Sequence, residues 1–325
     1  MLNIIFMGTP DFAKESLEAI YNAGHNIIAV VTNPDRPKGR GMKMIASPVK
    51  EFCLQQNIPV LQPEKIREIK DTLVQLNPDL FCVVAYGKIL PKDILEIPKL
   101  GSINVHGSLL PKYRGAAPIQ WAVLNGDKTT GITTMYMDEG MDTGDIILKQ
   151  EVEIGENETT GELWERLSKI GGELLTETVD KIEKGMAPRT KQGKDFTLAP
   201  MLKKEISKID WENKTAQEIK NLIRGLNPIM GAYTTYNNKK IKIWKADKIE
   251  TQKFMEEHPE FKNHIDRFTT MVGGTIIFSD EKKGLYVKAK DGILLIQEVQ
   301  AENSRKMNIQ DFLRGNPLKM GELFE

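Results

Sequence analysis

The chain has 325 residues, and its 45 Lys and Arg balance 45 Asp and Glu, so its formal net charge at pH 7 is zero. Its two cysteines and four histidines are scattered and form neither a disulfide framework nor a zinc-ligand spacing. No apolar run approaches the roughly 18 residues that a membrane span needs. We therefore expect a globular cytoplasmic protein with no metal and no membrane contact, long enough for two domains.

In the first half of the chain, short β-branched runs alternate with helical patterns. Strands are expected at 3–7, 26–32, 79–85 and 102–105, and helices at 11–23, 48–55 and 64–76. A strand pair at 131–137 and 146–152 and a long helix ending near 182 follow. Because strands that alternate with helices form parallel sheets, the pattern predicts a doubly wound α/β domain with a mainly parallel, Rossmann-like sheet.

The second half has a different character. Residues 184–210 contain Gly, Pro and many lysines without a sustained period, as expected of a linker. A helix at 215–226 is followed by five short alternating runs, at 232–236, 241–246, 274–278, 285–289 and 293–299. Five short antiparallel strands predict a small β-barrel of OB type. The expected organisation is an α/β domain over 1–183, a linker, and a barrel domain over 211–325.

The turn after the first strand, Gly8-Thr-Pro10, could suggest a dinucleotide site. The fingerprint of such sites needs three glycines at fixed spacing, and here Pro10 and Asp11 stand where the backbone would approach a pyrophosphate. A carboxylate at that point would repel phosphate. An ordinary strand-to-helix turn is the favoured interpretation.

The stretch 102–118 is the richest in polar chemistry. Asn104 and His106 are two apart at a strand end, so both side chains project to one face of the sheet, near the carboxyl end where ligands bind in open α/β sheets. An amide and an imidazole there could donate to a developing oxyanion, and the imidazole could carry a proton. Alternatively, His106 satisfies a local carbonyl and Asn104 caps a turn.

An acidic segment at 137–145 lies between the expected strands at 131–137 and 146–152. Its acids do not match the ligand spacing of a calcium-binding EF-hand loop. It is either a polar hairpin turn, or it brings Asp142 beside His106, where a carboxylate would hold one tautomer and favour the protonated ring. The residues alone leave both interpretations open.

These motifs together resemble the methionyl-tRNA formyltransferase family over essentially the whole chain. The resemblance rests on MGTPDFA at 7–13, PDRPKGRGMKM at 34–44, NVHGSLLPKYRGAAPIQW at 104–121, MDEGMDTGD at 137–145 and LRG at 313–315. It implies that Asn104, His106 and Asp142 are catalytic. It also implies that the folate co-substrate is bound by five residues, Tyr86, Ser108, Leu109, Leu110 and Pro111.

The implied reaction moves the formyl group of 10-formyltetrahydrofolate to the α-amino group of methionyl initiator tRNA. No metal is required, and a monomer is expected. The barrel domain is expected to bind tRNA. Four cations on the glycine-rich loop resemble the element that reads the acceptor stem: Arg36, Lys38, Arg40 and Lys43. With two prolines and few apolar anchors, this loop is expected to become ordered only when phosphates bind.

Three other classes of protein share part of this pattern. Glycinamide ribonucleotide formyltransferases have the same catalytic residues but a much shorter chain. Amino-sugar formyltransferases, which act on sugar nucleotides, have a second domain but diverge from the GAAPIQW and MDEGMDTGD patterns. A non-catalytic RNA-binding protein would not need an intact Asn104, His106 and Asp142 set. The charged segment near 250–267 matches no pattern.

Overall fold

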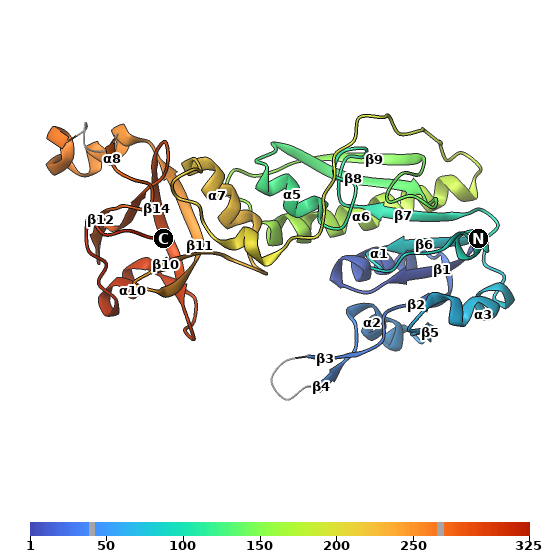
Figure 1. Ribbon diagram of the computed structural model, residues 1–325. Helices are drawn as coiled ribbons and strands as arrows, with labels where there is room; N and C mark the ends of the chain where they lie inside the picture. Colours follow the sequence, from blue (N-terminus) through green and yellow to red (C-terminus); the bar gives the residue numbers. More distant parts are fainter. Residues whose placement is uncertain (39–42, 265–269) are drawn as a thin grey trace. The chain divides into compact units, whose positions relative to one another are not determined.

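The computed structural model describes residues 1–38, 43–264 and 270–325, which form two compact units (Figure 1). Unit 1 consists of Met1–Ile119, Lys128–Ile154 and Glu162–Met201, and unit 2 of Gln120–Asp127, Gly155–Gly161 and Leu202–Glu325. Among the described helices, none is both long and apolar enough to cross a membrane.

Unit 1 is built on one sheet, with the strand order β5-β2-β1-β6-β7-β8-β9 among the described residues. Its strands are β1 (Asn3–Gly8), β2 (Asn26–Val31), β5 (Val60–Leu61), β6 (Leu80–Val84), β7 (Ser102–His106), β8 (Thr129–Tyr136) and β9 (Ile146–Glu153). The pairs from β5 to β7 are parallel, and β8 and β9 add antiparallel pairs at one edge. All five residues of β6 are buried, which explains its uninterrupted apolar sequence.

The helices of this half are α1 (Asp11–Asn22), α2 (Pro48–Gln56), the 3-10 helix η1 (Ile66–Ile69), α3 (Lys70–Gln75), α4 (Lys92–Leu95), α5 (Pro118–Leu124) and α6 (Thr160–Glu183). As predicted, α2 begins after Ser47, whose hydroxyl accepts a hydrogen bond from the Lys50 backbone N–H at 3.1 Å. One helix was predicted over 64–76. It is divided into η1 and α3 because Ile69 leaves the helical region, with φ −110° and ψ 15°.

Unit 2 contains an antiparallel sheet in the order β10-β11-β14-β13-β12, with β15 paired to β14, in the part that the structure describes. Its elements are η2 (Lys204–Ser207), α7 (Ala216–Gly225), β10 (Ala232–Tyr236), β11 (Lys239–Ile249), α8 (Thr251–Glu257), η3 (Pro259–His264), β12 (Ile276–Asp280), β13 (Gly284–Lys288), β14 (Ile293–Ala301), β15 (Met307–Asn308) and α10 (Ile309–Gly315). The predicted fold class, a mainly parallel α/β sheet followed by a small antiparallel barrel-type domain, is confirmed.

The segment near 250–267, which matched no pattern in the sequence, begins with α8 and η3. Phe254 and His258 stack with ring centroids 4.6 Å apart, and His258 also contacts the rings of Phe278 and Tyr286. This aromatic cluster attaches the described part of the segment to strands β12 and β13, so the segment belongs to unit 2.

The chain does not divide into its two units at a single linker, because each unit contains three separate segments. The predicted linker begins by running along unit 1, where Thr190 bridges to Ile146 and Leu198 bridges to Arg114. Conversely, part of α5 groups with unit 2, because the buried Arg224 guanidinium donates to the Val123 carbonyl oxygen at 3.5 Å. No hydrophobic period in the sequence indicates that either segment packs with the other unit.

Candidate active site

The carboxyl ends of the parallel strands meet at one edge of the sheet of unit 1. Strand order reverses between β1 and β6, and ligands of open α/β sheets bind at such a switch point. Asn33 joins the chain segments that follow these strands, because its side-chain amide donates to Thr9 Oγ1 and to the Tyr86 carbonyl oxygen, each at 3.0 Å. This edge is therefore held together before any ligand binds.

Asn104 and His106 alternate along β7 with the buried residues Ile103 and Val105. The His106 residue is only 6% exposed. Asn104 is half-buried, and within the described part of the chain its side-chain amide makes no hydrogen bond. The amide of Asn104 is therefore available to a ligand, whereas the imidazole is already held by the protein.

Two groups hold the His106 ring. Its Nε2 lies 2.9 Å from the Tyr113 carbonyl oxygen and its Nδ1 lies 3.7 Å from Asp142 Oδ2. Because a carbonyl oxygen only accepts, Nε2 carries a proton. Tyr113 is in the left-handed region, with φ 64°, where a side chain other than glycine is strained. The sequence left open whether His106 binds a local carbonyl oxygen or lies beside a carboxylate. In the structure the ring does both, through different nitrogen atoms.

Asp142 is held in a tight turn. It has φ 54°, and its Oδ2 accepts a hydrogen bond from the Gly115 N–H at 2.8 Å. Gly115 has φ +127°, and a Cβ there would lie 2.6 Å from the Ala199 carbonyl oxygen, so only glycine fits. The close approach of three chain segments fixes where the carboxylate lies.

A residue that the sequence did not identify, Gln192, supports the same turn. Its amide nitrogen donates to the carbonyl oxygens of Asp142 and Gly144, at 2.8 and 2.9 Å. Its oxygen accepts from Arg114 Nε and a terminal guanidinium nitrogen, at 3.1 and 2.7 Å. The nitrogen of the Gln192 side chain therefore holds the Asp142 turn, and its oxygen joins that turn to Arg114.

We expect Gln192→Leu to lower kcat roughly 10-fold while the KM for folate changes little, because a small displacement of a catalytic group reduces the rate more than it reduces binding. Steady-state kinetics would measure this effect. Gln55→Leu, at an exposed position of α2, is the matched control. Unchanged kcat in Gln192→Leu would show that the turn keeps its shape without this amide.

The segment expected to hold folate, Ser108 to Pro111, is fixed by side chains of the neighbouring strands. Thr133 of β8 donates to the Ser108 carbonyl oxygen at 2.7 Å and accepts from the Leu110 N–H at 3.1 Å. The Lys149 ammonium of β9 donates to the Leu110 carbonyl oxygen. Ser108 and Leu110 are fully buried, whereas Leu109 and Pro111 are half-buried, so a ligand would meet mainly Leu109 and Pro111.

The ring of Tyr86, which is expected to contact folate, is buried in the protein core. Its side chain is packed in the core and the residue is 2% exposed. Burial raises the pKa of its hydroxyl to about 12. Ala85 has φ 45°, which turns the chain at the end of β6, and Ile89 shortly afterwards is 90% exposed. At this edge Tyr86 is almost inaccessible and its carbonyl oxygen already accepts from Asn33, whereas Ile89 is an apolar surface that the sequence did not single out.

No strand was predicted in the glycine-rich loop, which is expected to become ordered only when phosphates bind. Its described residues form an antiparallel hairpin of β3 (Arg36–Lys38) and β4 (Lys43–Ile45). Asp35 fixes the hairpin base by accepting from Lys50 Nζ at 2.6 Å and Gln62 Nε2 at 2.8 Å, and the Lys50 hydrogen bond lowers the pKa of Asp35. Arg40, one of the four predicted tRNA contacts, lies outside the described residues.

The chain has two units, and polar residues lie at the edge of the sheet in the first of them. Known protein families match each of these two parts of the chain. Residues 2–179 match the formyl transferase family, and residues 201–317 match the formyl transferase C-terminal domain. The chain therefore belongs to the formyl transferase family.

Close relatives extend over almost the whole chain. A methionyl-tRNA formyltransferase of Clostridioides difficile (strain 630) is 49% identical over 323 residues, 98% of this chain and 99% of the relative. One from Ruminiclostridium cellulolyticum is 47% identical over 324 residues, 99% of each chain.

Solved structures share the fold. An N-formyltransferase from Helicobacter canadensis, in complex with folinic acid, superposes with a TM-score of 0.65 at 22% identity, covering 91% of this chain and 99% of that one. HypX from Aquifex aeolicus, in complex with tetrahydrofolic acid, gives a TM-score of 0.60 at 15% identity, over 100% of this chain and 50% of that one. At these identities the similarity concerns the fold alone.

Proposed function

We propose that this chain transfers the formyl group of 10-formyltetrahydrofolate to the α-amino group of methionyl initiator tRNA. The observation that carries the proposal is the near-complete coverage by relatives that are named methionyl-tRNA formyltransferase. The arrangement of Asn104, His106 and Asp142 at one sheet edge supports it. We further propose that the enzyme acts as a monomer in the cytoplasm, and size-exclusion chromatography would test the first point.

The proposed chemistry begins when the neutral amine attacks the formyl carbon. This forms a C–N bond and moves the carbonyl electron pair onto oxygen, which gives a tetrahedral oxyanion. Asn104 has a free amide and is the proposed direct donor to that oxygen. The intermediate collapses when the bond from carbon to N10 of the folate breaks and a proton reaches N10.

His106 and Asp142 are assigned to the proton and the charge. The attacking nitrogen must lose a proton as N10 gains one, and an imidazole is suited to carry it. With Nε2 bound to the Tyr113 carbonyl oxygen, Nδ1 is the ring atom that remains for this exchange, and Asp142 lies beside it. The protonated ring would also stabilise the oxyanion, in a site with little exposure to water.

Folate is proposed to bind along Ser108, Leu109, Leu110 and Pro111 and near Tyr86. The half-buried Leu109 and Pro111 can pack against a flat heterocycle at little entropic cost, because side chains of the neighbouring strands already hold this segment in place. The exposed Ile89 side chain supports the proposal by offering an apolar surface at the carboxyl end of β6.

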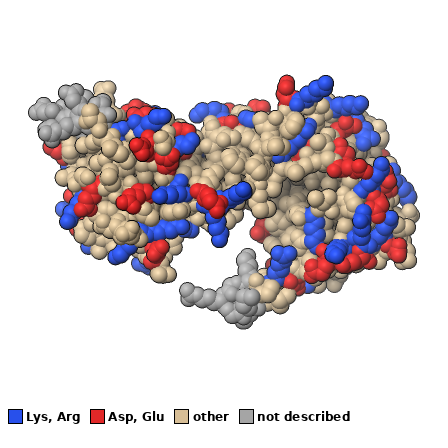
Figure 2. Space-filling model, viewed as in Figure 1, with Lys and Arg blue, Asp and Glu red and all other residues tan. Residues whose placement is uncertain are grey.

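The tRNA is proposed to contact the hairpin through Arg36, Lys38, Arg40 and Lys43. On the face that Figure 2 shows, basic and acidic side chains are interspersed over each unit, so charge does not delimit a patch there. In unit 2, Lys240 and Lys242 alternate with the buried Ile241 and Ile243 of β11, which places them on the outer face of the strand. These lysines are further candidates for phosphate contacts.

Arg36→Ala is expected to raise the KM for methionyl-tRNA roughly 10-fold, since a good charged contact contributes ~1–3 kcal/mol. The log–log slope of tRNA binding against salt should flatten by about 0.7–0.9 per lost phosphate contact. Lys65→Ala, an exposed lysine outside the hairpin, is the charge-matched control. If both variants change the slope equally, the hairpin makes no special contribution to binding.

The activity itself is tested by incubating the purified chain with 10-formyltetrahydrofolate and either charged or uncharged initiator tRNA. Formyl-methionine should form only with the charged tRNA. An amino sugar nucleotide offered as acceptor distinguishes the main alternative, a sugar formyltransferase. Transfer to the sugar, without transfer to tRNA, would refute the proposal.

A further inference from the structure

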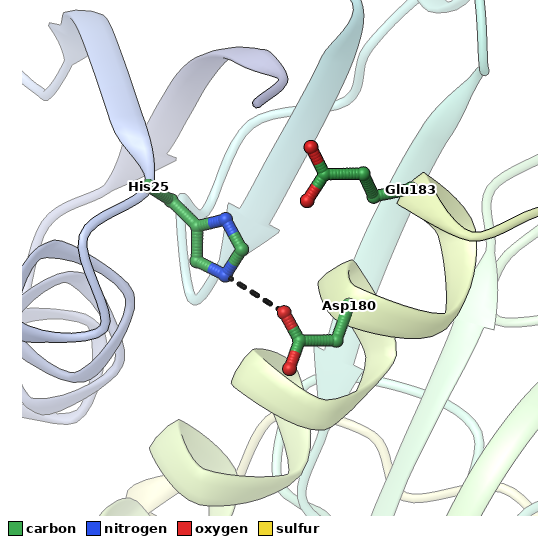
Figure 3. A group of neighbouring side chains, drawn as sticks. All are labelled: His25, Asp180 and Glu183. Carbon is green, nitrogen blue, oxygen red and sulfur yellow. Dashed lines mark ion pairs between the residues drawn. The ribbon is translucent and has the colours of Figure 1, made fainter.

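A group of potential metal ligands lies on unit 1 and takes no part in the proposed reaction. His25 is in the turn between α1 and β2, and Asp180 and Glu183 are in the last turns of α6. One donor atom from each lies within 4.8 Å of the other two. Figure 3 shows the three side chains pointing toward one another. The spacing of three residues puts both carboxylates on one face of α6.

His25 supplies the most informative observation. Its side chain is 6% exposed, and Nε2 is buried without a hydrogen-bond partner among the described residues. Buried polar atoms are almost always paired, so an unpaired imidazole nitrogen needs an explanation. The nitrogen is directed at the acidic group, because Asp180 Oδ1 lies 3.4 Å away. That separation is long for a hydrogen bond.

The distance of 3.4 Å between His25 Nε2 and Asp180 Oδ1 is the distance expected between two ligands of one metal ion. Zinc binds imidazole nitrogen at about 2.0–2.1 Å and carboxylate oxygen at about 2.0–2.2 Å, and tetrahedral angles then place the two donors about 3.4 Å apart. Asp180 and Glu183 have side chains that are 48% and 32% exposed, which leaves an open side for water to complete the coordination.

Charge also suits a divalent cation. Glu183 contributes a carboxylate that pairs with the positively charged amino group of Met1. An ion would compete with that amino group for one oxygen. Imidazole together with carboxylates favours zinc and its first-row neighbours over magnesium or calcium, which prefer oxygen ligands alone.

We propose that His25, Asp180 and Glu183 bind a divalent transition-metal ion of the zinc class. The site is structural, because His25 precedes β2 and so lies at the amino edge of the parallel strands, whereas His106 ends β7 at the carboxyl edge. The ion joins the end of α6 to the turn before β2. This inference departs from the expectation of no metal, since the ligands are far apart in the sequence, and it does not depend on formyl transfer.

The test uses untagged full-length protein that has been stripped with a chelator. Titration with ZnCl2 in a calorimeter should give one ion per chain, and the same addition should raise Tm, because ligands that bind only the folded state stabilise it. His25→Ala and Asp180→Asn should each weaken zinc binding at least about 10-fold, the range seen when a metal-site residue is altered.

Glu177→Gln is the matched control, because Glu177 is an exposed acid of α6 that pairs with Lys181 instead. It should bind zinc as the unaltered protein does. Should His25→Ala fail to fold, Asp180→Asn still decides, since that side chain is half-exposed and the change preserves its shape. Absence of saturable binding, or equal affinity in Asp180→Asn and the unaltered protein, would overturn the proposal in favour of a simple His25–Asp180 ion pair.

Discussion

Replacing His106 or Asn104 by alanine is expected to lower kcat by roughly 10²–10³-fold, the loss measured when one donor to an oxyanion is removed from an enzyme. Both side chains lie on β7, and neither is required to hold the strand, whose core contacts are made by Ile103 and Val105. Folate binding should remain nearly unchanged in both variants. Single-turnover formylation, together with fluorescence titration of folate, separates the two effects.

The two variants should differ in one respect. The side chain of Asn104 makes no hydrogen bond within the described residues, so Asn104→Ala leaves no partner unpaired. His106→Ala leaves the Tyr113 carbonyl oxygen without its donor, and Tm should fall. Asn22→Ala, at an exposed position near the end of α1, controls for loss of an amide. Near-normal turnover in Asn104→Ala would remove this residue from the mechanism.

Much of the fold could be predicted because, in most helices and strands, the spacing of apolar residues in the sequence matches the residues that are buried in the structure. The run at 79–85 reads as a fully buried strand, and all five residues of β6 are buried. Asn237-Asn238 separates two alternating runs, and both asparagines adopt positive φ between β10 and β11. Such signals are local, so the sequence reports them directly.

The support of the candidate site could not be predicted, because it depends on contacts between distant segments. Gln192 lies in a stretch with no period, where a glutamine is ordinary, and its role appears only when its amide meets the Asp142 turn. The same holds for Tyr113, whose backbone oxygen rather than its side chain contacts His106. Every residue has a backbone carbonyl, so the residue type does not indicate which carbonyl will contact a catalytic side chain.

The hairpin shows how composition can mislead. Two glycines, two prolines and four cations contain no strand signal, yet Arg36 pairs with Ile45 and Pro37 with Met44. Asp35 explains the difference, because its bonds to Lys50 and Gln62 fix the strand that enters the hairpin. Neither partner is close to Asp35 in the sequence.

Asp142→Asn is expected to lower kcat by roughly 10²-fold with little change in either KM, because a negative charge beside His106 stabilises positive charge that develops on the ring in the transition state. The carboxylate has two contacts, with the Gly115 N–H at 2.8 Å and with His106 Nδ1 at 3.7 Å. Asparagine retains an oxygen that can accept from Gly115. It also tolerates the left-handed backbone of this position about as well as aspartate does. The substitution therefore removes the charge and leaves the turn intact.

Two further variants complete the test. Asp142→Ala removes both contacts and places a less tolerant residue at φ 54°, so it should be slower than Asp142→Asn and less stable to heat. Asp138→Asn is the control within the same turn, since Asp138 accepts from Gly140 and Thr143 rather than approaching His106. If Asp142→Asn and Asp138→Asn both retain full kcat while Asp142→Ala loses it, then Asp142 shapes the turn and its charge takes no part in catalysis. If Asp142→Asn is as slow as predicted and Asp138→Asn is not, the negative charge next to His106 is what the reaction requires.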